Sequence, residues 1–311
     1  MSYAQLIGFG VAAVDDTFVV DGYPEADTKM RYLRKSRFGG GQTATALVAA
    51  SRLGCSCRWG GMLGENELSA FYRDVFRREG VAFNETVVAS EAEPVHSVII
   101  SDARTGSRTI MWGEDKLLAP QLGKEEFDWI DHAECLFVDQ ILPEMQLIAA
   151  RRAAKSGVAI VADIERVDYE PLKDMVELSG HFIFPASMAG PVFGESEPGA
   201  VLAKALKAGR KELVCMTDGC RGAWFAVAEN PDAVFHQPAF VVEPIVDSNG
   251  CGDVFHGAYA ACLVKGVSPR DRIRFASAAA ALKLRRNGGQ TGAPTWRELE
   301  EFLAGGPPTF A

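Results

Sequence analysis

Short apolar runs alternate with helical segments along much of this chain, and this alternation limits the folds open to it more than any other feature. Cys135–Val138 and Val158–Asp163 have the length and composition of buried strands, and a helix is predicted between them over Pro143–Lys155. The pattern predicts an α/β fold, a doubly wound and mostly parallel sheet with helices on both faces. Further strands are expected over Gln5–Val11 and Leu213–Thr217, and further helices over Glu67–Glu79 and Arg272–Leu284.

A second group of segments is strand-like without intervening helices. Val95–Ser101 and Arg108–Trp112 flank a turn at Thr105-Gly106, which predicts an antiparallel hairpin. Thr17–Val20 and Arg31–Phe38 have the same character. These segments predict a small β-sheet distinct from the parallel one.

The segment Asp247-Ser248-Asn249-Gly250-Cys251-Gly252-Asp253 carries the strongest chemical signal. We expect a strand over Phe240–Val246 to end here and a helix to follow over Val254–Leu263. Glycines let the backbone approach a ligand closely, and the free N–H groups of residues 250–252 at a helix start attract an anion. A carboxylate beside an anion site is explained if Asp253 takes a proton from a hydroxyl that attacks phosphorus.

Other interpretations of this motif are open. Strand–glycine–helix junctions are common, and Asp253 could serve only the helix dipole. The chain contains no Gly-x-x-x-x-Gly-Lys-Ser/Thr loop. A dinucleotide fingerprint is excluded because the motif lies near the C-terminus without a following βαβ unit.

A second glycine cluster, Phe38-Gly39-Gly40-Gly41-Gln42, precedes a small-residue helix that ends at Gly54. Here too the backbone is expected to approach another group closely at a helix N-terminus. The alternative explanation is tight packing of this helix on the sheet.

Composition excludes several classes of protein. The formal net charge of −9 argues against a nucleic-acid surface, and no apolar stretch is long enough to span a membrane. Seven dispersed cysteines without a Cys-x-x-Cys pair predict reduced thiols in the cytoplasm. The five histidines lack metal-ligand spacing, so no divalent site made by protein alone is predicted. The basic run of Lys283, Arg285 and Arg286 is expected to be mainly a solvated face.

The two glycine motifs, together with the early acidic residues Asp15 and Asp27, resemble those of the PfkB/ribokinase family of carbohydrate kinases over nearly the whole chain. The resemblance implies a single ribokinase-like domain over residues 1–311. Its small sheet would form a lid from about residues 16–38 and 94–113. It also implies a homodimer joined through the lid.

The resemblance assigns roles to individual residues. Asp253 matches the catalytic base, and Gly250, Cys251 and Gly252 match the anion hole. On the sugar side it implies the binding residues Asp15, Asp27, Lys29, Gly40, Gly41, Gln42, Thr45 and Arg108. Gln42 and Thr45 stand where the family has other residues, and without the resemblance Asp15 reads as a turn or cap residue. Lys29 has the alternative of being an exposed lid residue.

For the cofactors, the segment Thr217-Asp218-Gly219-Cys220-Arg221-Gly222 resembles the one that lies along the nucleotide, with Thr217, Gly219 and Gly222 as its contacts. Gly219 could equally be a plain turn glycine. Asp247 and Asn249 match a loop that often shares a monovalent cation such as K⁺ with the segment 287–292. The Asn-x-x-Glu motif that helps to order the metal is missing at Phe184-Pro185-Ala186-Ser187-Met188. Mg²⁺ is therefore expected to be held chiefly by ATP and water.

The resemblance implies an ATP-dependent kinase that phosphorylates a primary hydroxyl of a small sugar. A ketose is favoured, because segments 22–31 and 106–110 look like those of the ketohexokinase branch. Lys29 and residues 253–258 also look like the sulfofructose kinase branch, but no Arg lies near Asp139-Gln140-Ile141 to bind a sulfonate. Ribose, a sugar phosphate or a nucleoside are alternative acceptors, and a weakly catalytic nucleotide- or sugar-binding regulator is the alternative function.

Overall fold

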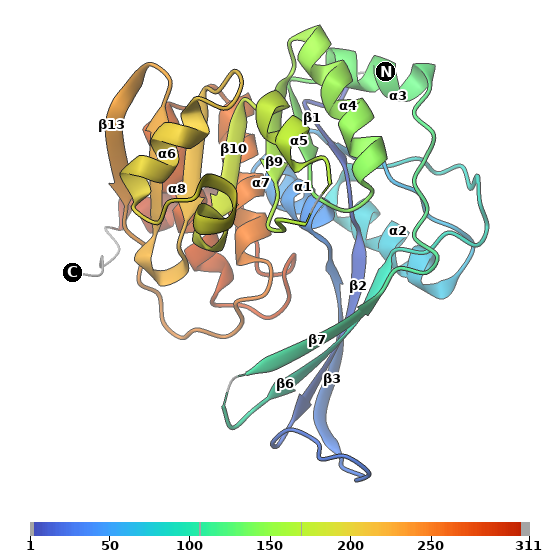
Figure 1. Cartoon of the computed structure of the whole chain (residues 1–311). Coiled ribbons are helices and arrows are strands. Elements are labelled where there is room, and N and C mark those ends of the chain that lie inside the picture. Colours follow the sequence, from blue (N-terminus) through green and yellow to red (C-terminus); the bar gives the residue numbers. More distant parts are fainter. Residues whose placement is uncertain (1–2, 106, 169, 306–311) are drawn as a thin grey trace.

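The protein is built from a layered α/β body and a small sheet that projects from one side of it (Figure 1). The computed structural model describes residues 3–105, 107–168 and 170–305 of the 311. Nine strands form the large sheet in the order β13-β12-β11-β10-β9-β8-β1-β4-β5. The pairs from β11 through β5 are parallel, and only β12 and β13 run antiparallel to their neighbours. The predicted mostly parallel sheet is thereby confirmed. Its strands are β1 Leu6–Phe9, β4 Cys57–Trp59, β5 Val81–Ala82, β8 Cys135–Val138, β9 Ala159–Asp163, β10 His181–Pro185, β11 Leu213–Thr217, β12 Ala223–Val227 and β13 Asn230–Gln237.

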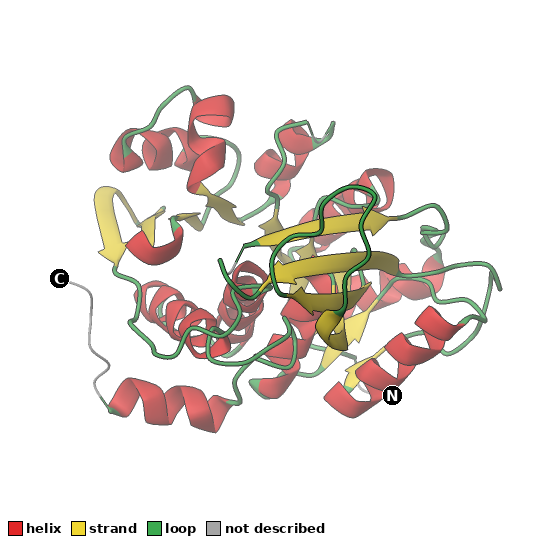
Figure 2. Ribbon diagram, turned by 90° about the horizontal axis from the view of Figure 1, so that it is seen from below, coloured by secondary structure: helices red, strands yellow, loops and turns green. Residues whose placement is uncertain are grey.

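Helices cover both faces of this sheet (Figures 1 and 2). Residues of β1 alternate between two separate cores, with Leu6 in one and Ile7 in the other. The first core holds residues of α1, α2, α7, α8 and α9, and the second holds residues of α3, α4, α5 and α6. The helices are α1 Gln42–Arg52, α2 Glu67–Glu79, α3 Lys124–His132, α4 Pro143–Ser156, α5 Leu172–Leu178, α6 Pro198–Leu206, α7 Cys251–Val264, α8 Pro269–Lys283 and α9 Trp296–Ala304.

Local sequence signals explain where the helices begin and end. The Asn66 side chain caps α2 by accepting from the Ser69 N–H at 2.9 Å, and Gly80 ends this helix in the left-handed region. Thr295 and Glu298 form a reciprocal capping box at the start of α9.

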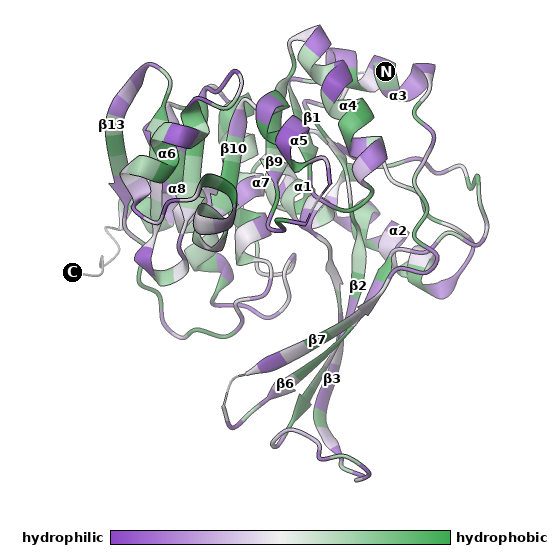
Figure 3. Ribbon diagram, viewed as in Figure 1, coloured by the Kyte–Doolittle hydropathy of each residue, from purple (hydrophilic) through white to green (hydrophobic). Residues whose placement is uncertain are grey.

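The small sheet has the order β3-β2-β6-β7, with strands β2 Ala13–Val20, β3 Tyr32–Gly40, β6 Val95–Asp102 and β7 Arg108–Gly113. Its β6–β7 pair is the predicted hairpin; Gly106 of the turn lies outside the described residues. Strand β2 begins earlier than the predicted Thr17, so Asp15 lies within β2 and is not a turn or cap residue. Figure 3 shows apolar stretches along these strands as well as in the layered body.

The strand predicted over Phe240–Val246 is wrong. Phe240 makes an isolated bridge, and residues 241–246 form no regular element. Pro244 has no N–H to donate to a neighbouring strand. The N–H groups of Val246 and Asp247 donate to the Leu284 carbonyl, at 2.7 and 3.2 Å, at the end of α8. The segment therefore fixes the start of the 247–253 motif against a helix end.

In the described part of the chain, no helix has both the length and the apolar character that crossing a membrane requires. All seven cysteines are free thiols.

Candidate active site

The N-terminus of α7 presents backbone donors that have no acceptor in the described part of the chain. Gly250 caps the helix with φ of 76°, and a side chain there would lie 2.7 Å from the Gly289 Cα. Among the described residues, none accepts a hydrogen bond from the N–H groups of Gly250, Gly252 or Asp253. The N–H of Cys251 was expected to be free, but it makes a long hydrogen bond of 3.4 Å to the Ser248 carbonyl. The donors available to an anion are therefore chiefly Gly250, Gly252 and Asp253.

Asp253 lies in the first turn of α7 among other carboxylates. Burial, followed by the charges of Asp163 and Glu165, raises the pKa of Asp253 well above its ordinary value. Neither Asp163 oxygen has a hydrogen-bond partner among the described residues, and burial raises the pKa of that carboxyl strongly as well. The group is thus a stronger base than an ordinary aspartate, placed beside free N–H donors.

Sequence reasoning missed Asp163, Glu165 and His256. Asp163 ends β9, and Glu165 follows two residues later at the same edge of the sheet. The buried His256, one turn along α7 from Asp253, has its Nδ1 atom 3.5 Å from an Asp163 oxygen. The sequence did hold a signal for Asp163 and Glu165, because they lie at the carboxyl end of a predicted buried strand. Ligands of α/β sheets bind at this end of the strands.

Asp15 joins the small sheet to the 247–253 motif. Its side chain is 6% exposed, and the Asn249 amide donates to it at 3.4 Å. Burial raises the pKa of Asp15 to about 6, while hydrogen bonds from Ser97 and Asn249 oppose that shift. A Cβ at position 40 would lie 2.3 Å from the Asp15 carboxylate, so Gly40 leaves the room that this side chain occupies. The structure therefore brings together Asp15, Gly40 and Asn249, which are far apart in the sequence.

The predicted residues at the start of α1 have different surroundings. Gly41 has φ of 87°, and a Cβ there would lie 2.6 Å from the Val11 carbonyl. Gln42 is partly buried, and its side-chain oxygen accepts from Gln140 at 3.5 Å. Thr45 is fully buried, and its hydroxyl has no hydrogen-bond partner among the described residues. Its methyl group would lie 3.6 Å from a Cβ at Gly250, so Thr45 packs beneath the α7 N-terminus.

The predicted sugar-binding residues of the small sheet divide into two groups. Arg108, at the start of β7, donates to the Ser248 hydroxyl at 2.6 Å and so reaches the loop before α7. Asp27 and Lys29 are exposed, and the loop between β2 and β3 to which they belong lies at the end of the small sheet that is far from α7 (Figure 1). The structure does not bring these two residues to Asp253 within one chain.

The segment 217–222 lies at the end of β11. The Thr217 hydroxyl donates to the Phe184 carbonyl at 3.5 Å. Gly219 is exposed with φ of 53°, and no atom would lie within 4 Å of a side chain there. Gly222 has φ of 91°, and its Cβ would lie 2.1 Å from the Gln237 carbonyl. Gly222 is therefore required by packing, whereas Gly219 leaves open space.

Comparison with known proteins shows the family to which this chain belongs. The model of the pfkB family carbohydrate kinases matches residues 9–296. The chain belongs to the pfkB family of carbohydrate kinases. Mouse ketohexokinase is 27% identical over 302 residues, which cover 91% of this chain and 97% of that protein. A ribokinase-like protein from Agrobacterium tumefaciens has a TM-score of 0.88 and 26% identity, with 98% of each chain covered. An Escherichia coli protein, solved as a candidate ribokinase II with ATP and Mg²⁺, has a TM-score of 0.83 and 19% identity, covering 97% of this chain and 99% of its own.

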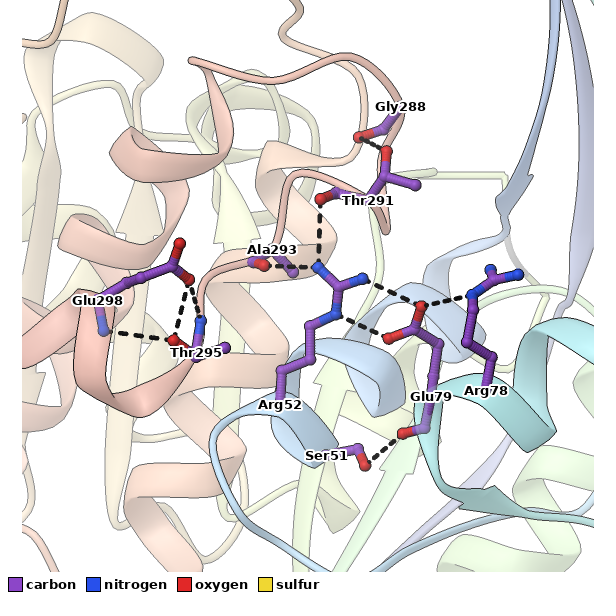
Figure 4. A network of polar contacts seen from close by, with 9 residues as sticks. All are labelled: Ser51, Arg52, Arg78, Glu79, Gly288, Thr291, Ala293, Thr295 and Glu298. Carbon is purple, nitrogen blue, oxygen red and sulfur yellow. Dashed lines mark hydrogen bonds and ion pairs between the residues drawn. The ribbon is translucent and has the colours of Figure 1, made fainter.

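In this pfkB-family kinase, the loop 287–295 lies against the 247–253 motif, and the Gly288 N–H donates to the Asp247 carboxylate at 2.8 Å. Arg52 holds the loop by donating to the carbonyls of Thr291 at 3.2 Å and Ala293 at 2.7 Å, while Glu79 binds the same guanidinium (Figure 4). The Thr291 hydroxyl turns back onto the loop and donates to the carbonyls of Asn287 and Gly288. The loop is therefore fixed by the protein's own donors.

A thiol at a helix N-terminus such as Cys251 can have its thiolate favoured by the helix dipole, and a nearby carboxylate such as Asp253 opposes this. Burial raises the pKa of Cys251 to about 11, with Asp247 and Asp253 acting in the same direction. A raised pKa favours the protonated thiol, which reacts more slowly with alkylating agents. Cys220 is exposed.

Proposed function

We propose that this pfkB-family kinase transfers the γ-phosphoryl group of ATP to a primary hydroxyl of a small sugar, with a ketose as the preferred acceptor. The observation that carries the proposal is the position of Asp253, in the first turn of α7 beside the unpaired N–H groups of Gly250 and Gly252. A raised pKa makes this carboxylate a stronger base.

In the proposed reaction, the Asp253 carboxylate takes the proton of the sugar hydroxyl. The sugar oxygen forms a bond to the γ-phosphorus, the bond from this phosphorus to the bridging oxygen breaks, and ADP leaves. The N–H groups of Gly250 and Gly252 receive the negative charge that develops on the transferred group. The helix dipole of α7 adds to this stabilisation.

On the acceptor side, Asp15 is placed to accept hydrogen bonds from sugar hydroxyls. Gly40 leaves the room for its carboxylate, and Asn249 orients it. Arg108 extends from the lid to Ser248 and would close the site over the sugar. Gln42 and Thr45 start α1 beneath this region, and we assign Gln42 to direct contact and Thr45 to support of Gly250.

On the nucleotide side, we assign Thr217, Gly219 and Gly222 to the surface along which ATP lies, since Gly219 leaves open space there. Among the described residues, neither buried oxygen of Asp163 accepts a hydrogen bond, and Glu165 lies nearby; such carboxylate oxygens suit the water shell of Mg²⁺. These residues would hold the hydrated ion bound to ATP, and Mg²⁺ would supply charge neutralisation of the phosphates. No group of three or more His, Cys, Asp and Glu side chains within the described ranges could hold a metal ion.

A homodimer through the lid is part of the proposal. The strands β3 and β7 of the lid expose large apolar side chains: Tyr32 at 56%, Leu33 at 62%, Met111 at 50% and Trp112 at 51%. A second copy would cover them. It would also give Asp27 and Lys29, which lie at the lid's free end, a route to a partner's sugar site.

The test is a coupled ADP-release screen over ketoses, aldoses, sugar phosphates and nucleosides, run with wild type and Asp253→Asn. The proposal expects turnover with a ketose that depends on Asp253. Turnover confined to sugar phosphates or nucleosides would reject the acceptor class. ATP binding without turnover of any acceptor would favour a binding regulator on this fold.

A further inference from the structure

Lys283 is the most unusual charged residue outside the reaction described above. It was expected to belong to a solvated basic face, yet its side chain is completely buried at the end of α8. The Nζ atom donates to the Asp247 backbone carbonyl at 2.6 Å and lies 3.6 Å from a carboxylate oxygen of the same residue. A buried ammonium needs such partners, because removing it from water is costly.

The Asp247 carboxylate is the centre of this cluster. One oxygen accepts from the Asn249 N–H and the other from the Gly288 N–H, both at 2.8 Å. The Lys283 ammonium supplies the positive charge that this partly buried carboxylate faces. Burial lowers the pKa of Lys283, and the negative charge of Asp247 opposes that shift.

The chain also makes room for the lysine. A Cβ at position 292 would lie 3.0 Å from the Lys283 Cγ and 3.1 Å from its Cε. Any larger residue at Gly292 would therefore press on the buried stem. The side chain of Asn249 turns toward Asp15, away from this cluster.

A monovalent cation at this place does not fit the residues present. A bound K⁺ replaces its water with carbonyl and carboxylate oxygens. Here the Asp247 carbonyl accepts from Lys283, and the loop carbonyls of Gly288 and Thr291 accept from Thr291 and Arg52. The Asp247 carbonyl and carboxylate and the carbonyls of Gly288 and Thr291 thus already accept from the protein's own donors, and the ammonium of Lys283 stands where a cation beside Asp247 would lie.

We propose that the Lys283 ammonium takes the place of a monovalent cation in this chain, so that the 247–253 loop is held in its working shape without K⁺. This inference rests on the proposed function for its catalytic consequence, because the held loop positions Gly250 and Asp253. Its structural part, a built-in cation at Asp247, does not depend on the identity of the acceptor.

The first experiment measures thermal stability without substrate, comparing KCl with tetramethylammonium chloride at an equal concentration of about 100 mM, so that screening is matched. Wild type should have the same Tm in both salts. Lys283→Ala opens a site beside Asp247, and K⁺ should raise the Tm of this variant by about 2–4 °C over tetramethylammonium. A K⁺-specific rise in wild type, or none in Lys283→Ala, would overturn the proposal.

Two further variants separate charge from packing. Lys283→Met keeps the stem volume without the charge, so it should fold and should not respond to K⁺. Lys211→Ala is a matched control, since Lys211 is also buried and donates to a backbone carbonyl, that of Val176. A response to K⁺ in Lys211→Ala equal to that of Lys283→Ala would show a general salt effect and reject a specific site. If Lys283→Ala fails to fold in tetramethylammonium chloride, folding in KCl alone would support the proposal. If it folds in neither salt, Lys283→Ser replaces it in the same comparison, and a response to K⁺ in wild type would still overturn the proposal.

The second experiment measures ADP release with the acceptor found in the screen. Wild-type turnover should be equal in the two salts. Lys283→Ala should lose about tenfold or more in tetramethylammonium and recover most of it in KCl or ethylammonium chloride. K⁺-dependent turnover in wild type would contradict the inference while leaving the kinase assignment intact. Absence of turnover with every acceptor would contradict the proposed function, and the thermal experiment would still test Lys283.

Discussion

Helices α1 and α7 both begin directly after glycines, but the glycines have different roles at the two N-termini. At α1, the N–H groups of Ala44 and Thr45 donate to the carbonyls of Val11 and Gly41. No acidic residue lies in its first turn. At α7, Asp253 lies in the first turn, and the described residues offer no acceptor to the N–H groups of Gly250 and Gly252.

The space that a side chain would find at the glycines also differs between the two helix starts. Side chains at Gly39, Gly40 and Gly41 would collide with Gln290, Asp15 and the Val11 backbone, respectively. A side chain at Gly252 would meet a single neighbour, a Glu165 oxygen at 3.8 Å. The first cluster is therefore explained by packing and by room for Asp15. In the second cluster, packing against Gly289 explains Gly250, and open space for an anion explains Gly252. Similar glycine patterns thus serve different physical purposes in one chain.

The largest effect is expected at the acid that distinguishes α7. Asp253→Asn should keep nucleotide binding and lose turnover by about 10³-fold or more, because the proton acceptor is removed. Steady-state ADP release together with calorimetric ATP titration checks this. The acid limb of the wild-type pH–rate profile should lie above the ordinary range of an aspartate, since burial raises the pKa of Asp253. Turnover within tenfold of wild type would remove Asp253 from the role of base.

The contrast between the two glycine clusters can be tested by a pair of alanines. Gly252→Ala should leave the fold intact and reduce turnover by about 10²-fold, because its Cβ enters the space meant for the phosphoryl group. Gly41→Ala should instead lower the free energy of unfolding by about 1–3 kcal/mol, because the left-handed backbone is strained and the Cβ meets the Val11 carbonyl. Urea denaturation and ADP release on both variants give the comparison. The reverse pattern would mean that the two helix starts have been assigned the wrong way round.

Smaller effects are expected at Asp15, where a substitution should weaken sugar binding but stabilise the folded protein. Asp15→Asn should weaken sugar binding by about 1–3 kcal/mol through loss of an ionised acceptor. It should also stabilise the protein at pH 8 by up to about 3 kcal/mol, because burial raises the pKa of Asp15 from 3.8 to about 6 and the folded state is penalised for holding the charge.

The sign of this pH dependence follows from proton binding. Between pH 4 and 6 the folded state holds the proton more tightly than the unfolded state, so wild-type stability falls as the pH rises through this window. The advantage of Asp15→Asn should therefore vanish toward pH 4, as measured by urea denaturation. If Asp15→Asn is more stable than wild type by the same amount at every pH, the pKa of Asp15 is not raised in the folded state.

The smallest effect is expected at Cys251. Cys251→Ala should retain turnover within about twofold of wild type, because the anion contacts at this helix come from backbone N–H groups. Iodoacetamide at pH 7.5 should modify Cys220 first, since Cys220 is exposed and burial raises the pKa of Cys251 to about 11. Peptide mapping by mass spectrometry identifies the modified residue. Rapid modification of Cys251 with loss of turnover would contradict this.

The layered fold could be predicted because strands buried on both faces, such as Cys135–Val138, are continuously apolar. Asp253 and its glycines could be predicted because the whole motif lies within seven consecutive residues. Asp163 and Lys283 could not be predicted in the same way, because their neighbours are distant in the sequence. Lys283 contacts Asp247, which lies 36 residues earlier in the sequence. From its basic neighbours in the sequence, this lysine was predicted to lie on a solvated face. The strand predicted over Phe240–Val246 failed because Pro244 has no N–H and the Val246 N–H donates to the end of α8.

The most direct test of the account is a crystal structure with ADP, Mg²⁺, aluminium fluoride and the acceptor found in the screen. The account predicts that the fluoride group, which mimics the transferred phosphoryl group, accepts from the N–H groups of Gly250 and Gly252. It also predicts that the Asp253 carboxylate lies within hydrogen-bond distance of the attacking sugar hydroxyl. A fluoride group bound at the start of α1, or an Asp253 side chain turned away from the sugar, would contradict the central claim that α7 is the catalytic helix.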